Sequence, residues 1–343
     1  MKAKLISGLS LCCLLWPAAA TENVTPQAAL VLPKASQALV TDIIDVSKHY
    51  YLAVGERGHI LKSPNGQTWQ QITVPLNVLL TSVYFVDETH GWAVGHDASI
   101  LHSHDGGVSW QIQQFLPELD KPLFDVVFKD RLHGIAVGAY GMFYRTRDGG
   151  KQWLPEFNPT LASAEDQEFL AELKETDPEA YEAELESVLP HFNRLVRDGS
   201  TLYMAGEAGF VAVSHDFGES WQRLPEFYNG SLFAIAKTPQ NSLLVAGLRG
   251  HLFRSTDQGV SWQAIELPSN ATLNSIYVSA QGQIYVAGNA GTLLVSSDDG
   301  VSFRELSQAD GKAIMQVVTG QQTLILATET GIQTIQQEET IQP

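Results

Sequence analysis

Two acids and an arginine are the residues of this sequence whose types and spacing could do chemistry together. Asp42, Asp125 and Arg194 occupy the same place in three copies of a repeated unit. Two carboxylates that face each other across a cleft are what a glycoside hydrolase needs as acid and base. Whether these residues meet depends on the elements that position them, and the repeat defines those elements.

A pattern of about 41 residues occurs six times along the chain. Each copy holds a small-Gly-x-x-Gly turn and then the Asp box S/T-x-D-x-G-x-S/T-W, as in Val245–Trp262. The first glycines of the turns are Gly55, Gly95, Gly138, Gly206, Gly247 and Gly288, and the closing aromatics are Trp69, Trp110, Trp153, Trp221, Trp262 and Phe303. Both series are interrupted between the third and fourth copies, where about 27 residues are inserted.

Each copy contains four short, β-rich segments separated by Gly, Asn and Asp, and a truncated seventh copy runs from Val317 to Gly331. Repeats of this length with four strands each are typical of blades closed into a ring. We therefore expect an all-β, seven-bladed β-propeller, a single domain over residues 21–343. The seventh blade lacks a strand, and Ala28–Leu32 could supply it and close the ring.

The Asp boxes favour a role in folding. Their aspartates can accept hydrogen bonds from turn amides, and their aromatic residues can pack between blades. The box at Lys62–Trp69 is degenerate, with Pro64 in the place of the Asp. One carboxylate per box does not make a calcium loop, and isolated histidines such as His59, His96 and His251 have no second ligand at a metal-like spacing. We expect no metal and no cofactor.

The insert, at about residues 157–190, is acidic and helical in pattern. Ser163–Leu189 contains ten Asp and Glu residues and one lysine, Lys174. Ser163 and Asp177-Pro178 are suitable helix starts, and apolar residues such as Phe169 and Tyr181 recur at helical spacing. The sequence predicts a helical hairpin that lies on the propeller between blades 3 and 4.

Propeller connectivity places the Gly turns and the blade-to-blade linkers, including the insert, on one face, and the Asp boxes on the other. We predict a partner-binding face formed by Gly-turn residues and two aromatic residues of the insert. These are Glu56, Arg57, His96, Asp97, Tyr140, Glu207, Arg249, Asn289, Phe169 and Tyr181. Alignment of the innermost strands places Asp42, Asp125 and Arg194 at the mouth of the central channel, as a site or as solvated lining.

The N-terminus has the features of a secretory signal. Lys2 and Lys4 precede an apolar segment, Leu5 to Trp16, and an Ala-x-Ala motif that ends at residue 20. Both cysteines lie inside that segment, so we expect a mature periplasmic chain without disulfides. The formal net charge of −17 argues against nucleic-acid binding. No apolar run in the rest of the chain is long enough to span a membrane.

The units at Val94–Trp110 and Val137–Trp153, each with a Val-Gly turn followed by an Asp box, resemble the photosystem II stability/assembly factor family. The resemblance covers nearly all of residues 38–335 apart from the insert. It implies a seven-bladed propeller in the thylakoid lumen or periplasm that holds a membrane-protein precursor without catalysis. Relatives outside phototrophs are suspected of serving other membrane machinery. The acidic insert, and a chain with only 21 Lys and Arg, depart from the family's basic docking patch.

The sequence therefore predicts a non-catalytic, monomeric binding or scaffold protein whose partner is a membrane protein or membrane-associated complex. The alternative is an Asp-box glycoside hydrolase or glycan-binding propeller. A sialidase is disfavoured because the Phe/Tyr-Arg-Ile-Pro signature is absent. Asp42 and Asp125 are the only pair of acids that the alignment nominates for catalysis.

Overall fold

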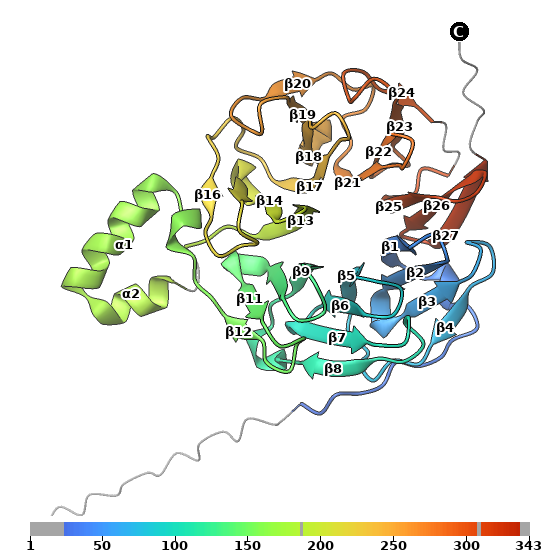
Figure 1. The fold of residues 1–343 in the computed structure, drawn as a ribbon, viewed down its shortest axis with the longest axis horizontal. Helices are drawn as coiled ribbons and strands as arrows, with labels where there is room; N and C mark the ends of the chain where they lie inside the picture. Colours follow the sequence, from blue (N-terminus) through green and yellow to red (C-terminus); the bar gives the residue numbers. More distant parts are fainter. Residues whose placement is uncertain (1–23, 186–187, 307–309, 337–343) are drawn as a thin grey trace, which may run out of the picture.

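The computed structural model describes residues 24–185, 188–306 and 310–336. Seven antiparallel sheets are arranged around a central channel, and each sheet pairs strands that are consecutive in sequence (Figure 1). The prediction of an all-β, seven-bladed propeller is confirmed. The predicted signal segment, residues 1–20, lies outside the described residues.

Each blade places its first strand at the channel and its later strands progressively outward (Figure 1). The first strands are Val40–Val46 (β1), Leu80–Phe85 (β5), Leu123–Phe128 (β9), Phe192–Asp198 (β13), Leu232–Lys237 (β17), Leu273–Val278 (β21) and Ile314–Thr319 (β25). The second strands are Tyr50–Gly55 (β2), Gly91–Gly95 (β6), Gly134–Gly138 (β10), Thr201–Gly206 (β14), Leu243–Gly247 (β18), Ile284–Gly288 (β22) and Thr323–Thr328 (β26). The third strands are Ile60–Ser63 (β3), Ser99–Ser103 (β7), Phe143–Thr146 (β11), Val211–Ser214 (β15), Leu252–Ser255 (β19), Leu293–Ser296 (β23) and Gly331–Gln336 (β27). Six blades have a fourth strand: Gln70–Ile72 (β4), Gln111–Gln114 (β8), Leu154–Pro155 (β12), Gln222–Arg223 (β16), Gln263–Ile265 (β20) and Arg304–Glu305 (β24).

The apolar core lies between neighbouring blades. Every residue of β6, β10, β18 and β22 is buried, because these second strands have a neighbouring blade against each face. This explains why the sequence reads there as continuous small and apolar runs rather than as alternation.

The Asp boxes form one repeated hydrogen-bonded turn. In the box of blade 5, the backbone N–H of Gly259 donates to Ser255 Oγ at 2.8 Å, and Asp257 accepts from both the amide and the hydroxyl of Ser261. The indole of Trp262 donates to the carbonyl oxygen of Gly259 at 3.1 Å. Such bonds satisfy the turn's own backbone, so the box is structural.

The box of blade 1 corrects one expectation. Asn65, not Pro64, stands in the place of the aspartate, and its Oδ1 accepts from the amides of Gln67 and Thr68 at 2.9 and 3.0 Å. This box is one residue shorter than the others, between Ser63 and Trp69. An alignment that starts from Trp69 therefore places Pro64, one residue too early, at the position of the aspartate.

The N-terminal segment also differs from expectation. Residues 28–32 are not a strand of blade 7, which has only β25–β27 among the described residues. They run beside β4 of blade 1 instead, where the amide of Ala29 donates to the carbonyl oxygen of Val74 at 2.9 Å. The Gln71 side chain bonds the backbone of both Leu30 and Leu32. These contacts hold the segment on blade 1.

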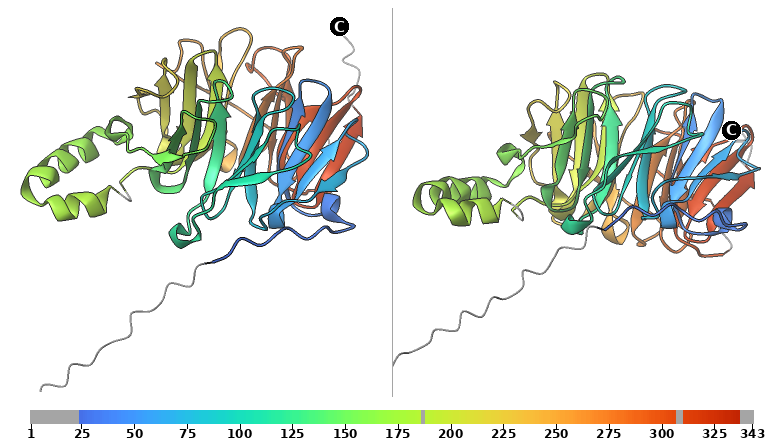
Figure 2. Two further views of the ribbon diagram at one scale, coloured as in Figure 1. Left: turned by 60° about the horizontal axis from the view of Figure 1, so that its bottom comes forward. Right: turned by 90° about the horizontal axis from the view of Figure 1, so that it is seen from below.

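The insert between blades 3 and 4 is a helical hairpin, as predicted, of Ala164–Thr176 (α1) and Pro178–Glu184 (α2). Ser163 and Asp177 cap the two helices, accepting from the amides of Asp166 and Ala180. The hairpin does not lie on the propeller but projects outward from its rim (Figures 1 and 2). Most side chains of α1 are exposed, and many are acidic, which favours solvent over an apolar surface.

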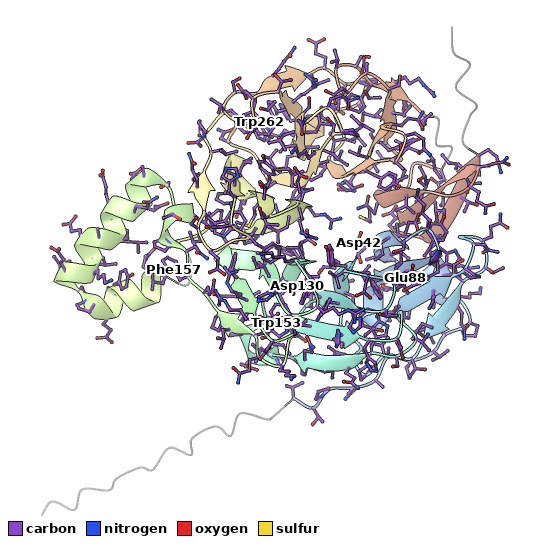
Figure 3. All side chains as sticks on the ribbon, in the orientation of Figure 1. Asp42, Glu88, Asp130, Trp153, Phe157 and Trp262 are labelled. Atoms are coloured by element: carbon purple, nitrogen blue, oxygen red, sulfur yellow. The ribbon has the colours of Figure 1, made fainter. Side chains whose placement is uncertain are left out.

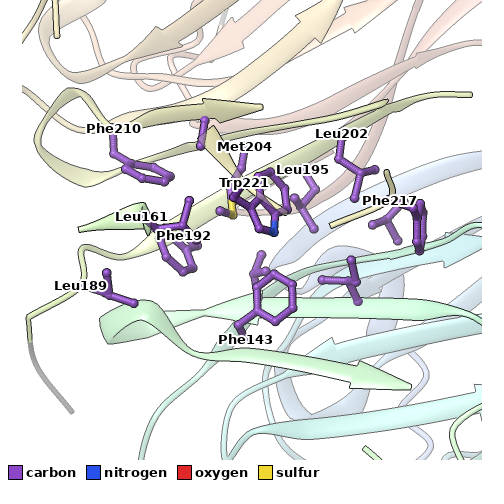
Figure 4. Close-up of a cluster of buried hydrophobic side chains, with 14 of the residues drawn as sticks. Phe143, Leu161, Leu189, Phe192, Leu195, Leu202, Met204, Phe210, Phe217 and Trp221 are labelled. Atoms are coloured by element: carbon purple, nitrogen blue, oxygen red, sulfur yellow. The ribbon is translucent and has the colours of Figure 1, made fainter. Parts of the chain in front are cut away.

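The flanks of the hairpin anchor it in the core between blades 3 and 4. Leu161 and Leu189 are buried there with Phe143, Phe192 and Trp221 (Figure 4). The linker is therefore fixed at both ends while the helices extend away. None of the described helices is both long and apolar enough to cross a bilayer.

Candidate functional site

The structure brings Asp42, Asp125 and Arg194 together inside the channel. They come from the innermost strands β1, β9 and β13. In each strand the residue directly follows a break in the pairing with the second strand. Figure 3 labels Asp42 beside the central opening. Arg194 Nη2 lies 3.6 Å from Asp42 Oδ1, and Arg194 Nε lies 3.7 Å from Asp125 Oδ2. A guanidinium thus links two carboxylates from other blades.

Both carboxylates are buried and already hydrogen-bonded. Asp42 accepts from the amides of Ile43 and Val83 at 3.0 and 3.1 Å, and Asp125 from those of Val126 and Leu195 at 2.9 and 2.8 Å. These amides lie on the channel edge of the innermost strands. The carboxylates therefore satisfy backbone groups that no neighbouring strand pairs.

Ser82 of β5 lies between the two acids. Its Oγ is 3.1 Å from Asp42 Oδ2 and 2.8 Å from Asp125 Oδ1. One hydroxyl has one proton to donate, so it cannot serve both carboxylates at once. Gln316 of β25 adds a long contact of 3.5 Å from its Nε2 to Asp42 Oδ1.

The electrostatics of this cluster favour a fixed network. Burial raises the pKa of Asp125, opposed by the charge of Arg194 and by hydrogen bonds from Leu195 and Ser82. Burial disfavours the charge on Arg194, but the carboxylates of Asp125 and Asp42 outweigh it and raise the pKa of the guanidinium. Arg194 therefore stays charged, and Asp125 is the carboxyl that takes up a proton more easily than usual.

The cluster lines a cavity of about 680 Å³. The lining continues from these residues to Ser47, Lys48 and Gly199, in the turns that follow β1 and β13, and includes no Gly-turn residue. Asp42 is 2% exposed and Asp125 is 6% exposed. The three residues thus lie at the inner end of a cavity that runs toward the face opposite the Gly turns.

The Gly turns present their predicted residues around one face of the ring. The third residue of the turn is left-handed in all six blades that have it: Arg57, Asp97, Tyr140, Ala208, Arg249 and Ala290, with φ between 51° and 58°. Arg57, His96, Tyr140, Glu207, Arg249 and Asn289 are exposed, and Glu56 and Asp97 are half-buried. The residues are distributed among the blades rather than gathered in one pocket.

Three residues of the Gly-turn face, Tyr140, Glu207 and Arg249, have neighbours that the sequence did not reveal. The rings of Tyr140 and His191 lie 4.6 Å apart, and Glu207 Oε2 lies 4.0 Å from His191 Nε2. Arg249 lines a hollow of about 460 Å³ with Tyr228 and His251. His191 follows Pro190 at the end of the insert. This position beside the linker was the only feature of the sequence that could have placed His191 on the Gly-turn face.

The two insert residues lie apart from the Gly turns, because the hairpin projects outward (Figure 1). Phe169 is 47% exposed on α1. The half-buried Tyr181 of α2 faces the other helix, with Lys174 Nζ 5.4 Å from its ring centre. The predicted binding residues therefore form two separate areas, the Gly-turn face and the hairpin.

Comparison with known proteins places the chain among relatives of known fold. The family model described as Photosynthesis system II assembly factor YCF48 matches residues 61–121 and 113–266. A photosystem II assembly protein Ycf48 from Synechococcus sp. (strain JA-2-3B'a(2-13)) is 44% identical over 54 residues, 15% of this chain and 16% of the relative. The corresponding protein of Thermosynechococcus vestitus is 35% identical over 43 residues, 12% of each chain. The chain thus aligns with only a small part of these relatives.

Solved structures extend the likeness in fold to nearly the whole chain. YCF48 bound to a D1 peptide is 20% identical, with a TM-score of 0.66 over 91% of this chain and 95% of that one. YCF48 from Cyanidioschyzon merolae is 18% identical, with a TM-score of 0.67 over 92% and 100%. A GH74 xyloglucanase from Xanthomonas campestris, 13% identical with a TM-score of 0.66, covers 92% of this chain and 54% of its own. At these identities the structural likenesses concern the fold alone. The family model spans more than half of the residues, and the chain belongs to the family of the photosystem II assembly factor YCF48.

Proposed function

We propose that this chain is an exported, non-catalytic propeller that binds a segment of a membrane protein and assists the assembly or function of its complex. The observation behind the proposal is membership of the YCF48 family, together with the same fold in a YCF48 structure bound to a D1 peptide. A bound peptide in a relative makes a polypeptide the natural ligand class for this chain. The leader-like N-terminus supports a location outside the cytoplasm.

The state of the channel acids supports a binding role over catalysis. General acid–base catalysis requires a carboxyl group that can reach a substrate and exchange a proton with it. Asp42 and Asp125 are buried, accept hydrogen bonds from backbone amides, share the hydroxyl of Ser82 and lie within 3.7 Å of the Arg194 guanidinium. The likeness to a GH74 enzyme concerns the propeller fold.

We propose that the partner contacts the Gly-turn face and the hairpin. The Gly-turn face exposes an aromatic residue, Tyr140, and a cation, Arg249, both suited to peptide recognition. The hairpin presents a second, separate area with the exposed Phe169 among acidic residues. The Asp box of blade 5, by contrast, uses its aspartate and serine within its own turn.

The proposal is tested by crosslinking the purified protein to solubilised inner membranes and identifying the captured protein. Deletion of residues 164–184, which removes both helices and keeps Leu161 and Leu189 in the core, should leave a folded propeller and abolish capture of that protein. Phe169→Ala and Tyr140→Ala should weaken capture, and Val260→Ala, a truncation of a 67% exposed side chain in an Asp box, should not. Equal capture by the deletion variant and the native chain would overturn the proposed surface. Hydrolysis of a glycoside by the native chain would overturn the non-catalytic role.

A further inference from the structure

Three histidines share one face of blade 2 at its Asp-box end. In the β6–β7 ladder, Trp92 pairs with His102 and Gly91 with Ser103. His90 and His104 therefore lie opposite each other at the next position along the strands, toward the Asp box. Side chains alternate between the faces of a sheet, which puts His90, His102 and His104 on the same face. The ring centres of His90 and His102 are 6.1 Å apart, and those of His102 and His104 are 6.3 Å apart.

His102 occupies a position that has a structural task in other blades. Lys62, Arg145 and Arg254 stand at the same place in β3, β11 and β19. Each donates to a carbonyl oxygen in the next blade's Asp box: Lys62 to Gly106 at 2.7 Å, Arg145 to Gly218 at 2.6 Å and Arg254 to Asp299 at 2.7 Å. These bonds tie neighbouring blades together.

In blade 2 another side chain performs this task. Gln113 Nε2 donates to the carbonyl oxygen of Gly149, in the box of blade 3, at 2.8 Å. His102 Nε2 is buried and has no hydrogen-bond partner among the described residues. Buried polar atoms are normally paired, so this nitrogen lacks the partner that its position would usually give it.

The surroundings of His102 hold its imidazole in place. Its ring stacks on the buried Trp92, with 4.8 Å between the ring centroids. The ring of His102 is therefore the fixed member of the three.

His90 is oriented by a carboxylate in the manner of a metal ligand. Its Nδ1 lies 3.3 Å from Asp87 Oδ1 and 2.9 Å from Thr89 Oγ1. Arg131 holds the other oxygen of Asp87 at 2.7 Å. A carboxylate on one ring nitrogen fixes the imidazole and leaves the other nitrogen for a ligand.

We propose that His90, His102 and His104 bind one divalent transition metal ion of the kind that prefers imidazole, with Zn²⁺ as its representative. In their present positions, no three His, Cys, Asp or Glu side chains in the described part of the chain are close enough together to hold a metal ion. With Zn–N bonds of about 2.0–2.1 Å, the ring centres of two ligands lie about 5 Å apart, so these rings must approach by about 1 Å. His104 is exposed and can turn toward His102, whereas His90 needs to shift by only about 1 Å while Asp87 still holds its Nδ1. Water would complete a tetrahedral site.

Blade 3 supplies a matched control within the same chain. His133 Nδ1 lies 2.9 Å from Asp130 Oδ1, the counterpart of the His90–Asp87 contact. Arg145 and Arg147 stand there in the places of His102 and His104. A cation-lined position repels a metal ion, so His133 should contribute nothing to its binding.

The test is a titration of the tag-free protein with Zn²⁺, followed by calorimetry, and with Co²⁺, followed by the absorption bands that report tetrahedral nitrogen ligands. We expect one equivalent to bind and to raise the melting temperature. His104→Ala, in an exposed turn, and His102→Ala should each weaken binding by at least about tenfold. His133→Ala should leave it unchanged, and circular dichroism checks that every variant is folded. Absence of saturable binding, or equal affinity in folded His104→Ala and native protein, would overturn the proposal.

Discussion

The guanidinium of Arg194 in β13 crosses the channel to Asp42 in β1, with 3.6 Å between Arg194 Nη2 and Asp42 Oδ1. Because Asp125 lies 3.7 Å from the same side chain, one cation compensates two buried acids from blades 1 and 3. The network thus joins the first, third and fourth blades at the centre of the ring. Its strength depends on the charge of each member.

Removal of the Arg194 charge should destabilise the propeller in a pH-dependent way. We expect Arg194→Met to lower the free energy of unfolding by roughly 2–4 kcal/mol at neutral pH, because the carboxylates lose their compensation. Urea unfolding at pH 7.5 and pH 5 measures the loss. Arg197→Met, at another cavity-lining arginine whose Nε donates to the Gly199 carbonyl, is the control and should cost less.

The sign of this pH dependence follows from Asp125. Burial raises the pKa of Asp125 in the folded state, so its protonation stabilises the fold below the unfolded value of 3.8. That contribution is lost as the pH rises through the folded pKa. Without Arg194 the folded pKa rises further, so the loss in Arg194→Met should be smaller at pH 5. An equal loss at both pH values would contradict this account.

The Asp boxes should make the propeller sensitive to acid below about pH 4. Burial raises the pKa of Asp105, but the hydrogen bonds from Ser109, Ser103 and Val108 together outweigh it and lower the pKa to about 2. Asp216 is lowered to about 2 in the same way by Ser220 and Ser214. A lowered pKa gives stability that is present above 3.8 and lost as the pH falls toward 2.

Melting temperatures between pH 6 and pH 2 test the role of these carboxylates. The double variant Asp105→Asn/Asp216→Asn should fold, because Asn65 already fills the same position in blade 1. It should melt lower than the native chain at neutral pH and show a flatter decline in acid. A decline as steep as that of the native chain would mean that other groups control acid unfolding.

Gly209 and Gly199 both have a left-handed backbone, but only Gly209 closely approaches another part of the chain. Substitution of each by alanine therefore distinguishes a steric clash from backbone strain. A Cβ at Gly209, where φ is 70°, would lie 1.7 Å from the carbonyl oxygen of Tyr228. At Gly199, where φ is 62°, a Cβ would meet nothing within 4 Å. We expect Gly199→Ala to cost about 1 kcal/mol for the left-handed backbone, and Gly209→Ala about 3 kcal/mol or more because the linker must also move. Chemical denaturation of both variants measures the difference, and similar costs would disprove the close approach.

Arg145 should matter to stability far more than its neighbour Arg147. The Arg145 side chain is 4% exposed, donates to Glu156 at 2.7 Å and bonds the carbonyl oxygens of Phe217 and Gly218 in the next blade. Arg147 is 51% exposed and pairs with Glu219. Arg145→Met should lower the free energy of unfolding by roughly 2–4 kcal/mol, and Arg147→Met by less than about 1 kcal/mol. Comparable effects in thermal unfolding would show that burial does not decide the contribution.

The period of the repeat was enough to predict the ring, since each copy of about 41 residues supplies the strands of one blade. The equivalence of Asp42, Asp125 and Arg194 also followed from spacing, because the turn glycine keeps a nearly constant distance from the innermost strand. Their mutual contacts did not follow from spacing. These contacts depend on how far each side chain reaches across the channel toward strands of other blades.

The position of the helical hairpin and the route of residues 28–32 were beyond prediction from the sequence. Connectivity fixes the face from which a linker leaves, but its direction depends on how Leu161 and Leu189 enter the core between blades. The role of residues 28–32 depends on the Gln71 side chain, which can bond an extended segment on blade 1. The histidine face was missed because His90 and His104 become neighbours only through the register of a hairpin.

In the part of the chain that the structure describes, the first and seventh blades meet without exchanging a strand. Blade 1 is built from β1–β4 and blade 7 from β25–β27, and side chains such as Val40, Ile43, Val318 and Ile325 pack between them. Among the described residues no blade-to-blade linker crosses this boundary, so side-chain packing and the contact of Ala35–Gln37 with β27 hold it together. Amide hydrogens of β25–β27 should exchange with deuterium earlier than those of β9–β11, so the junction of the two blades would act as the place where the ring first opens and last closes.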